Sequence, residues 1–272
     1  GDVVVVRISD WGNGHLGPAG EVETVLGPRT DTGVDVLAIL YAHGLPLDFP
    51  DEVVEEAEAI AARGIQPADL EGRLDLRDQL IFTIDPADAR DHDDALSIRP
   101  AGEGRWEVGV HIADVGHYVR EGSALDVEAL RRGNSVYLVD RVVPMLPEAL
   151  SAGICSLMPD EDRLAMSVLM VVDEEGKVVD SRVVRSVIRS RHRLSYEEAQ
   201  GVIEGTSSVD EETDEALHRL IEISHQLRRV RAERGGCTDG QDQYEWDVPL
   251  SQRAAGRPRA VLETADVYHR QV

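Results

Sequence analysis

The sequence predicts an α+β (mixed α/β) fold, in which a mixed β-sheet is flanked by helices. Residues 106–113 alternate between apolar and other side chains, the pattern of a strand with one buried face. Residues 217–230 repeat apolar side chains at helical spacing, and Gly235 follows as a helix terminator. Because strand and helix patterns intermingle along most of the chain, we expect helices packed on a sheet.

The first 62 residues are expected to form a unit of their own, ahead of a larger domain over residues 63–272. Residues 1–27 contain two strand patterns, separated by a glycine-rich loop at residues 12–20. Two strands are not stable by themselves in water. This pair must therefore complete a larger sheet or pack against the residues that follow.

Local signals predict where further elements begin and end. A helix is expected from Asp48 and Pro50 to about Arg63, because proline suits a first turn and Gly64 suits the C-terminal cap. A capping box of Ser195 to Glu198 opens another helix. Further strands are predicted at residues 80–84, 164–172 and 178–195, and a further helix at residues 126–132.

The formal net charge of −24 argues against nucleic-acid binding, because that binding requires cations that neutralise phosphates. The distribution of charge counts for more than its sum, however. Many of the acidic residues fall in exposed helical patterns, which is typical of a solvating acidic surface. We expect a salt-rich cytoplasm to screen the repulsion among them.

The expected location is the cytoplasm, with no membrane association. No apolar run approaches the ~20 residues that span a bilayer. Cys155 and Cys237 could form one disulfide at most, and a chain of this size needs none, so a reduced compartment is the simpler interpretation. The chain starts with Gly1 and carries no leader pattern, so we expect it to begin inside a longer protein.

The strongest local feature is a run of five aspartates within ten residues, directly after the apolar segment 80–84. These residues are Asp85, Asp88, Asp91, Asp93 and Asp94. Carboxylates packed this densely repel one another unless a cation lies among them. Hard oxygen ligands favour Mg²⁺ or Mn²⁺, and two such ions ~3.5–4 Å apart can stabilise the attacking and leaving oxygens of a phosphodiester displacement.

Three other kinds of site or segment could produce such an aspartate-rich run. A calcium-binding EF-hand loop needs Gly at its sixth position and Glu at its twelfth, and counting from Asp85 or from Asp91 meets neither condition. A zinc site has only His92 as an adjacent soft ligand. An exposed acidic loop remains open on composition alone, although the return to an apolar pattern at residues 95–98 argues against it.

These residues resemble the catalytic signature of the ribonuclease II and ribonuclease R family, also called the RNB family. Similar blocks follow in the same order, so the resemblance covers roughly residues 70–200. They are Gly109–Val119, Gly122–Asp126, Arg131–Leu138, Arg141–Pro147, Leu150–Leu157, Asp162–Ser167 and Arg193–Tyr196. Residues 1–62 look like the tail of the family's cold-shock (OB) domain and the linker that follows it.

The resemblance implies a hydrolytic, Mg²⁺-dependent exoribonuclease that degrades single-stranded RNA from its 3′ end to nucleoside 5′-monophosphates. It implies that Mn²⁺ can substitute, that the protein acts as a monomer, and that four aspartates serve the metals. Asp85 and Asp94 would hold a structural Mg²⁺, with Asp91 nearby. Asp93 would serve a second, substrate-bound metal, so Asp91 and Asp93 are the candidate catalytic residues. Asp88 matches none of the four.

The resemblance also implies two aromatic contacts with RNA. Tyr137 matches the residue against which the 3′-terminal base stacks, and Tyr196 matches a channel residue that helps to select ribose. For both, simple packing remains an open alternative. His111 and Asp114 are expected to brace the site rather than to ligate metal.

Four arginines could answer the objection raised by the net charge. Arg185, Arg189, Arg191 and Arg193 share one parity on the predicted strand 178–195, which would present four guanidinium groups to phosphates on one face. Ordinary ion pairs with neighbouring acids are the open alternative.

The chain departs from the family toward its C-terminus. Residues 237–268 fit the family poorly, and the later glutamate, the later arginine and the S1 domain of the family are not found. We therefore expect a fragment of a longer enzyme, inactive alone. The alternative is a non-catalytic RNA-binding relative that kept the fold.

Overall fold

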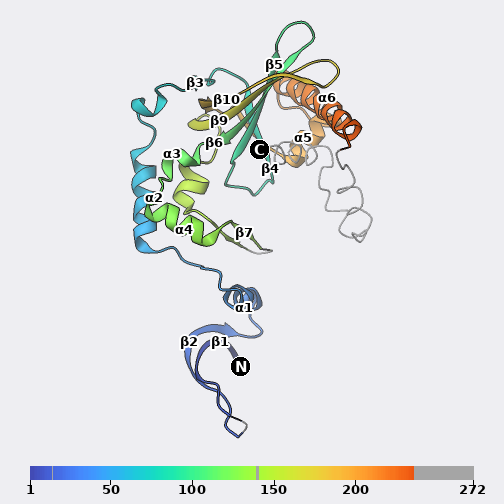
Figure 1. Ribbon diagram of the computed structural model, residues 1–272. Helices are drawn as coiled ribbons and strands as arrows, with labels where there is room; N and C mark the ends of the chain where they lie inside the picture. Colours follow the sequence, from blue (N-terminus) through green and yellow to red (C-terminus); the bar gives the residue numbers. More distant parts are fainter. Residues whose placement is uncertain (14, 139–140, 236–272) are drawn as a thin grey trace. The chain divides into compact units, whose positions relative to one another are not determined.

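The computed structural model describes residues 1–13, 15–138 and 141–235, which form two compact units (Figure 1). The first unit consists of residues 1–59 and 119–148, and the second begins at residue 60 and resumes at residue 149. The predicted boundary after residue 62 stays a prediction. The grouping of residues 119–148 with the N-terminal part was not foreseen.

The first unit opens with the predicted pair of strands. β1 (Asp2–Asp10) and β2 (Ala19–Pro28) form an antiparallel ribbon. A helix that the sequence reading did not identify, α1 (Val34–Ala42), follows after a left-handed Gly33. The predicted acidic helix is confirmed as α2 (Asp51–Arg63), and Gly64 adopts the positive φ that its capping position requires.

Residues 119–148 contain α4 (Ala124–Arg132), close to its predicted range, and the short strands β7 (Val136–Tyr137) and β8 (Val142–Val143). Arg132 ties this segment to the chain before α2. Its side chain is only 2% exposed and donates to Glu128 and to the carbonyl oxygen of Asp48, 2.7 Å away. The guanidinium carbon also lies 3.6 Å from the ring centre of Phe49. Arg132 also donates to the carbonyl oxygen of Pro144, 3.0 Å away, so one buried arginine holds three segments of this unit together.

The second unit is built on a seven-stranded sheet of order β11-β4-β5-β6-β9-β10-β3. The outermost pairs, β11–β4 and β10–β3, are parallel, and the others are antiparallel, so the predicted mixed sheet is confirmed. Its strands are β3 (Leu74–Asp75), β4 (Ile81–Asp85), β5 (Asp94–Pro100), β6 (Trp106–Ala113), β9 (Asp162–Val172), β10 (Val178–Arg189) and β11 (His192–Ser195). Short helical segments lie at η1 (Pro67–Leu70), α3 (Val115–Tyr118) and η2 (Ala149–Ile154).

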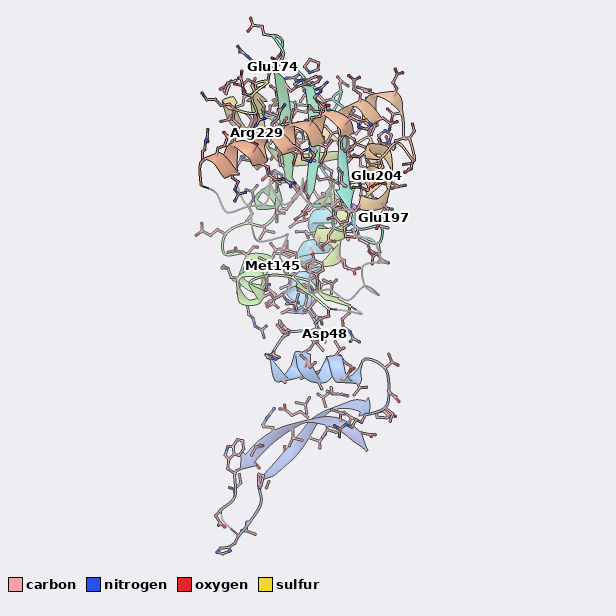
Figure 2. The ribbon with its side chains drawn as sticks, turned by 90° about the vertical axis from the view of Figure 1, so that its right-hand side faces the viewer. Asp48, Met145, Glu174, Glu197, Glu204 and Arg229 are labelled. Atoms are coloured by element: carbon pink, nitrogen blue, oxygen red, sulfur yellow. The ribbon has the colours of Figure 1, made fainter. Side chains whose placement is uncertain are left out.

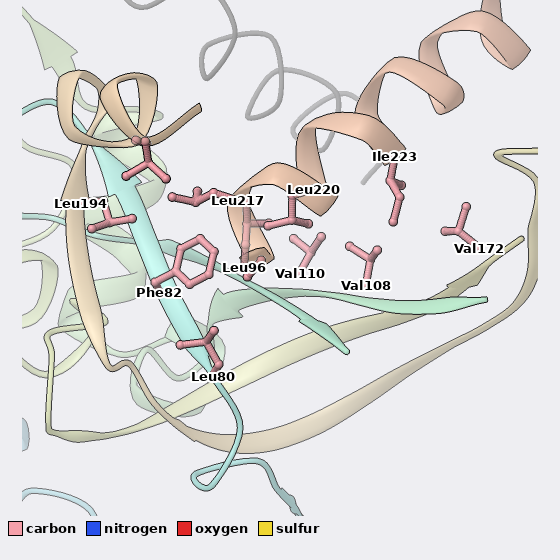
Figure 3. Packing of buried hydrophobic residues seen from close by; sticks show 13 residues of the cluster. Leu80, Phe82, Leu96, Val108, Val110, Val172, Leu194, Leu217, Leu220 and Ile223 are labelled. Carbon is pink, nitrogen blue, oxygen red and sulfur yellow. The ribbon is translucent and has the colours of Figure 1, made fainter. Parts of the chain in front are cut away.

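The core of this unit lies between one face of the sheet and the helices α5 (Tyr196–Ile203) and α6 (Glu211–Glu233). Figure 3 shows Leu217, Leu220 and Ile223 of α6 pointing toward Phe82 and Val110 of the sheet. All five side chains are buried. The apolar face of α6 read from the sequence therefore packs as predicted, and it fixes the strands whose ends carry the aspartates.

The prediction of one long strand over residues 178–195 is wrong. β10 ends at Arg189 and β11 begins at His192, and these strands lie near opposite edges of the sheet. Two residues reach only about 10 Å, so the sheet must curl until its edges meet at this end. The backbone N–H of Arg191 confirms this, because it donates to the carbonyl oxygen of Ile81 in β4.

Acidic side chains are spread over the outside of the second unit. Figure 2 labels Glu174 in the turn between β9 and β10, Glu197 on α5 and Glu204 directly after α5. All three are exposed. This distribution agrees with the predicted acidic surface.

None of the helices in residues 1–13, 15–138 and 141–235 has the length and apolar character needed to cross a bilayer. Cys155 is buried and not in a disulfide, and burial raises the pKa of its thiol to about 12. Cys237 lies outside the described residues.

Candidate metal-binding site

The aspartate cluster lies at one end of the sheet. Asp85 is the last residue of β4, and Asp94 is the first residue of β5. Because β4 and β5 are antiparallel, pairing Ile81 with Ser97, the end of one strand and the start of the other lie at the same sheet end. The loop between them carries Asp88, Asp91 and Asp93.

The predicted metal ligands differ in exposure. Asp85 is buried, with 9% of its surface exposed, whereas Asp91 and Asp94 are half-buried and Asp93 is exposed. Asp88, which was predicted to lie outside the ligand set, is exposed as well. This gradient places Asp85 at the floor of the cluster and Asp93 at its solvent side.

His92 is a buried residue of this loop and contacts Asp85. Its Nδ1 is 2.7 Å from Oδ2 of Asp85, and only 1% of its surface is exposed. The segment around His92 is held from a distant part of the chain: its backbone N–H donates to Oγ of Ser156, and its carbonyl oxygen accepts from the N–H of Leu157. The loop that carries the aspartates is therefore held in place at His92 by residues 156 and 157.

Tyr196 is brought to the same end of the sheet. β11 pairs with β4 so that Ser195 lies beside Asp85, and Tyr196 follows as the first residue of α5. The Ser195–Glu198 capping box predicted from the sequence is confirmed and fixes where this helix begins. Tyr196 is half-buried against the core, so its position fits both the packing alternative and a place beside the cluster.

Asp114, directly after β6, forms a buried ion pair. Its Oδ2 lies 2.6 Å from a terminal nitrogen of Arg73, and both side chains are less than 10% exposed. Arg73 also donates to the carbonyl oxygen of Ser186 and contacts Nδ1 of His117. Asp114 is thus engaged by arginine, in line with the expected bracing role.

Nearby, Asp69 accepts from the N–H of Gln66 and from Arg63. Burial alone would raise the pKa of Asp69, but these contacts, together with the positive charge at Arg63, hold it below its usual value.

His111 bridges hydroxyl groups within the sheet. Its Nε2 lies 2.9 Å from Oγ of Ser97, and its Nδ1 lies 2.7 Å from Oγ of Ser167. Ser167 in turn contacts the hydroxyl of Ser186 at 2.6 Å. Burial lowers the pKa of His111 to about 3, so the ring is neutral. These contacts make it a structural histidine rather than a metal ligand.

The cluster fits a hard divalent cation in donor type. Its ligand atoms would be carboxylate oxygens at one sheet end, which suit Mg²⁺ and Mn²⁺. Within the part of the chain that the structure describes, no three His, Cys, Asp or Glu side chains are gathered closely enough to hold an ion. Nε2 of His92 is buried without a hydrogen-bond partner there.

The four arginines do not form the expected wall. Arg189 donates to Asp162, and Arg191 pairs with Glu212. Arg185 lies on β10 and Arg193 on β11, so the shared parity of one strand does not apply to them. Two of the four therefore form ion pairs with neighbouring acids.

Asp162 shows the effect of these ion pairs. Although burial alone would raise its pKa, hydrogen bonds from Arg77 and Arg189 hold the pKa of Asp162 below its usual value.

Tyr137 belongs to the first unit, where it is the last residue of β7 and pairs with Val142 of β8. Its surface is 65% exposed, which excludes the alternative of a tyrosine packed in the core.

Two residues that support the site were not identified from the sequence. His92 was considered only as an isolated soft ligand, and Ser156 was noted only within a resembling block. Ser156 accepts from the His92 N–H and donates to the carbonyl oxygen of Arg90, across more than 60 residues of sequence.

The chain matches two known domains. The RNB domain matches residues 73–265, and the cold shock domain matches residues 1–50. The RNB match extends well beyond residue 200, so the expectation that residues 237–268 depart from the family is wrong for most of that stretch. Those residues lie outside the described part of the structure.

Named relatives agree with these matches. Ribonuclease R of Thermotoga maritima is 45% identical over 240 residues, which are 87% of this chain and 34% of that protein. Mycoplasma genitalium RNase R in complex with ribose-methylated single-stranded RNA superposes with a TM-score of 0.78 at 28% identity, covering 85% of this chain and 36% of that chain. The chain thus spans about a third of the length of such relatives.

A yeast protein, Ssd1, described as a pseudonuclease, superposes with a TM-score of 0.66 at 24% identity over 85% of this chain and 28% of that one. This likeness is one of fold alone. The RNB match, by contrast, takes in well over half of the residues and includes the whole aspartate cluster. This chain belongs to the RNB domain family.

Proposed function

We propose that the protein containing this chain is a hydrolytic, Mg²⁺-dependent exoribonuclease that degrades single-stranded RNA from its 3′ end to nucleoside 5′-monophosphates. The observation that carries the proposal is the placement of Asp85, Asp91, Asp93 and Asp94 at one sheet end, inside an RNB match. The chain supplies only part of the enzyme, and we expect it to be inactive alone.

The four aspartates have different tasks in this proposal. Asp85 and Asp94, which end and begin adjacent strands, hold a structural Mg²⁺, for which Mn²⁺ can substitute, and Asp91 lies nearby. Asp93, the exposed member, serves the second ion together with the substrate phosphate. When bound, the two ions supply charge stabilisation for an in-line displacement at the last phosphodiester. The rigid strands β4 and β5 keep the carboxylates in place before substrate arrives.

RNA is held by aromatic and cationic side chains. Tyr137 exposes its ring, which suits it to stack on the 3′-terminal base, and stacking of this kind tolerates any sequence. Tyr196, next to the strand partner of Asp85, contacts the terminal ribose. Arg185 and Arg193 are exposed and contribute to phosphate binding, whereas Arg189 and Arg191 must first give up carboxylate partners. An RNA-bound ribonuclease R of the same fold supports this assignment.

A non-catalytic RNA-binding relative is the second candidate. The same fold occurs in a protein described as a pseudonuclease, so fold does not decide between the two. The full set of four aspartates favours catalysis, because a binding module gains nothing from acidic side chains beside a phosphate.

The test is Asp93→Asn in the complete protein. The change preserves shape but removes a negative charge, and a neutral amide binds Mg²⁺ poorly. Hydrolysis should fall by two to three powers of ten, on the scale of about 3–4 kcal/mol for one preorganised electrostatic contact. Single-stranded RNA binding, measured by fluorescence anisotropy, should persist, because it rests on arginines and stacking.

Asp88→Asn is the matched control. Asp88 lies in the same loop, is also exposed, and lies outside the proposed ligand set, so hydrolysis should stay near the wild-type rate. An Asp93→Asn protein as fast as the control would remove Asp93 from catalysis. Loss of binding and hydrolysis together would mean that the cluster is mainly structural.

A further inference from the structure

We infer that His92 is a positioning residue for the metal site: its imidazole orients the carboxylate of Asp85 so that one oxygen is committed to His92 and the other is presented to the ion. The inference rests on the proposed function, because it assigns Asp85 as a ligand. It adds a nitrogen donor to a site otherwise assigned from aspartates.

The contact between the two side chains has a defined direction. Nδ1 of His92 lies 2.7 Å from Oδ2 of Asp85. A carboxylate accepts hydrogen bonds, so Nδ1 carries the proton and donates it. The bond uses Oδ2 and leaves Oδ1 of Asp85 uncommitted to His92. A carboxylate held through one oxygen cannot rotate freely, which fixes the direction in which the other oxygen points.

The backbone of His92 is held by hydrogen bonds at both its N–H and its carbonyl oxygen. The backbone N–H of His92 donates to Oγ of Ser156 at 3.1 Å, and its carbonyl oxygen accepts from the N–H of Leu157 at 2.8 Å. Oγ of Ser156 also donates to the carbonyl oxygen of Arg90, 2.8 Å away. Ser156 and Leu157 thus fix the backbone that carries the ring.

Packing alone does not account for a histidine at this position. The side chain is 99% shielded, and its Nε2 has no hydrogen-bond partner within the described residues. An apolar ring would fill the same space without burying an unpartnered nitrogen, which is unfavourable. What the imidazole contributes and a phenyl ring cannot is the bond from Nδ1 to Asp85.

A direct role for His92 as a ligand fits less well. Ligation through Nε2 would require further His, Cys, Asp or Glu side chains around that atom. Nδ1 is already engaged by Asp85, and Nε2 is buried with no hydrogen-bond partner among the residues that the structure describes. The geometry therefore points to an effect on the metal that passes through Asp85.

Three variants of the complete protein separate these roles. His92→Phe keeps the ring volume and removes the donor. His92→Asn keeps an N–H donor close to the position of Nδ1, whereas His92→Gln places its amide one bond further away. Mn²⁺ affinity, measured by electron paramagnetic resonance titration of free Mn²⁺ in the absence of RNA, is the readout, together with the melting temperature of the metal-free protein.

Loss of a side chain that supports a metal ligand typically weakens metal binding 10- to 100-fold. We expect a loss of that size for His92→Phe and His92→Gln, and recovery of most of the affinity in His92→Asn. The metal-free melting temperature of His92→Phe should fall, since the buried carboxylate of Asp85 loses its donor, and His92→Asn should restore it.

Wild-type Mn²⁺ affinity in His92→Phe would overturn the inference while leaving the proposed function intact. Equal losses of Mn²⁺ affinity in His92→Asn and His92→Gln would also overturn it. The affinity would then not depend on an N–H donor at the position of Nδ1. If His92→Phe does not fold, the Asn and Gln pair decides alone. Absence of any Mn²⁺ site in the wild type would instead contradict the proposed function, and the inference with it.

Discussion

At the scale of single residues, His111 shows how the interior of this sheet tolerates polar groups. The ring is fully buried between the hydroxyls of Ser97 and Ser167. A neutral imidazole has one N–H donor and one acceptor nitrogen, and a hydroxyl can match either. The arrangement satisfies every member without placing a charge in the core.

Replacing His111 by leucine should therefore lower the free energy of unfolding by about 1–3 kcal/mol, because Ser97 keeps a buried hydroxyl without its imidazole partner. Adding Ser97→Ala to His111→Leu should restore part of the loss, since both polar partners are then gone. Urea unfolding followed by circular dichroism measures both proteins. A double variant less stable than His111→Leu would contradict this account.

The same histidine should make stability depend on pH. Its pKa in the folded protein is about 3, below the ordinary value of 6.5, so below pH 6.5 the unfolded chain binds a proton that the folded protein does not. This contribution to stability is complete above pH 6.5 and falls as the pH drops toward 3, by up to about 1.4 kcal/mol per pH unit. The slope should be smaller in His111→Leu.

Only part of the candidate site could be assigned from the sequence, for a physical reason. The aspartates could be found because they are close in sequence and follow an apolar strand. The bond from His92 to Asp85 could not, because it depends on how the intervening loop turns. The contact of Ser156 with the loop could not be predicted either, since only folding brings this distant residue to the loop.

At the scale of elements, the stability of α6 depends on the capping residue that precedes it, Asp210. Asp210 caps the helix by accepting from the N–H and the hydroxyl of Thr213, at 2.9 and 2.8 Å, and it pairs with His192 of β11. The hydrogen bond from the Thr213 N–H is the main cause that lowers the pKa of Asp210, with His192 adding to it. The cap thus joins α6 to the strand that lies beside β4.

Asp210→Ala should cost about 1 kcal/mol of stability, the usual value for a lost N-cap. Asp210→Asn is the matched control, because asparagine caps helices about as well. Since the folded pKa is below the ordinary 3.8, the charged cap contributes fully above that pH and loses its contribution as the pH falls through the folded value. Unfolding measured at pH 7 and at pH 3 tests both statements, and equal stabilities of the wild type and Asp210→Ala at pH 7 would refute them.

Elements with a complete local pattern were predictable. β6, β9, α2 and α6 each carry their own periodicity and end signals, and the structure places them close to the predicted ranges. The break between β10 and β11 was not predictable in this way, because residues 178–195 keep a strand-like composition throughout. Ser190 turns the chain there through contacts of its hydroxyl with the carbonyl oxygens of His192 and Ile81, which belong to different strands.

At the scale of the whole molecule, the net charge of −24 should make stability depend on salt. Exposed acids such as Glu174, Glu197 and Glu204 repel one another over distances that salt shortens, from about 10 Å at 0.1 M to about 3 Å at 1 M. The melting temperature should therefore rise between 0.1 and 1 M KCl. A melting temperature that stays flat or falls over this range would rule out self-repulsion as a significant term.

The parallel pair β4–β11 has a consequence for the order of events during synthesis. Asp85 pairs with Ser195 of the adjacent strand β11, about 110 residues later in the chain. A ribosome delivers the N-terminal residues first, so the strand that carries Asp85 emerges long before its outer neighbour exists. The aspartates can reach their final arrangement only after β11 has left the exit tunnel. A nascent chain released early would thus carry all four carboxylates and lack the strand that pairs with β4.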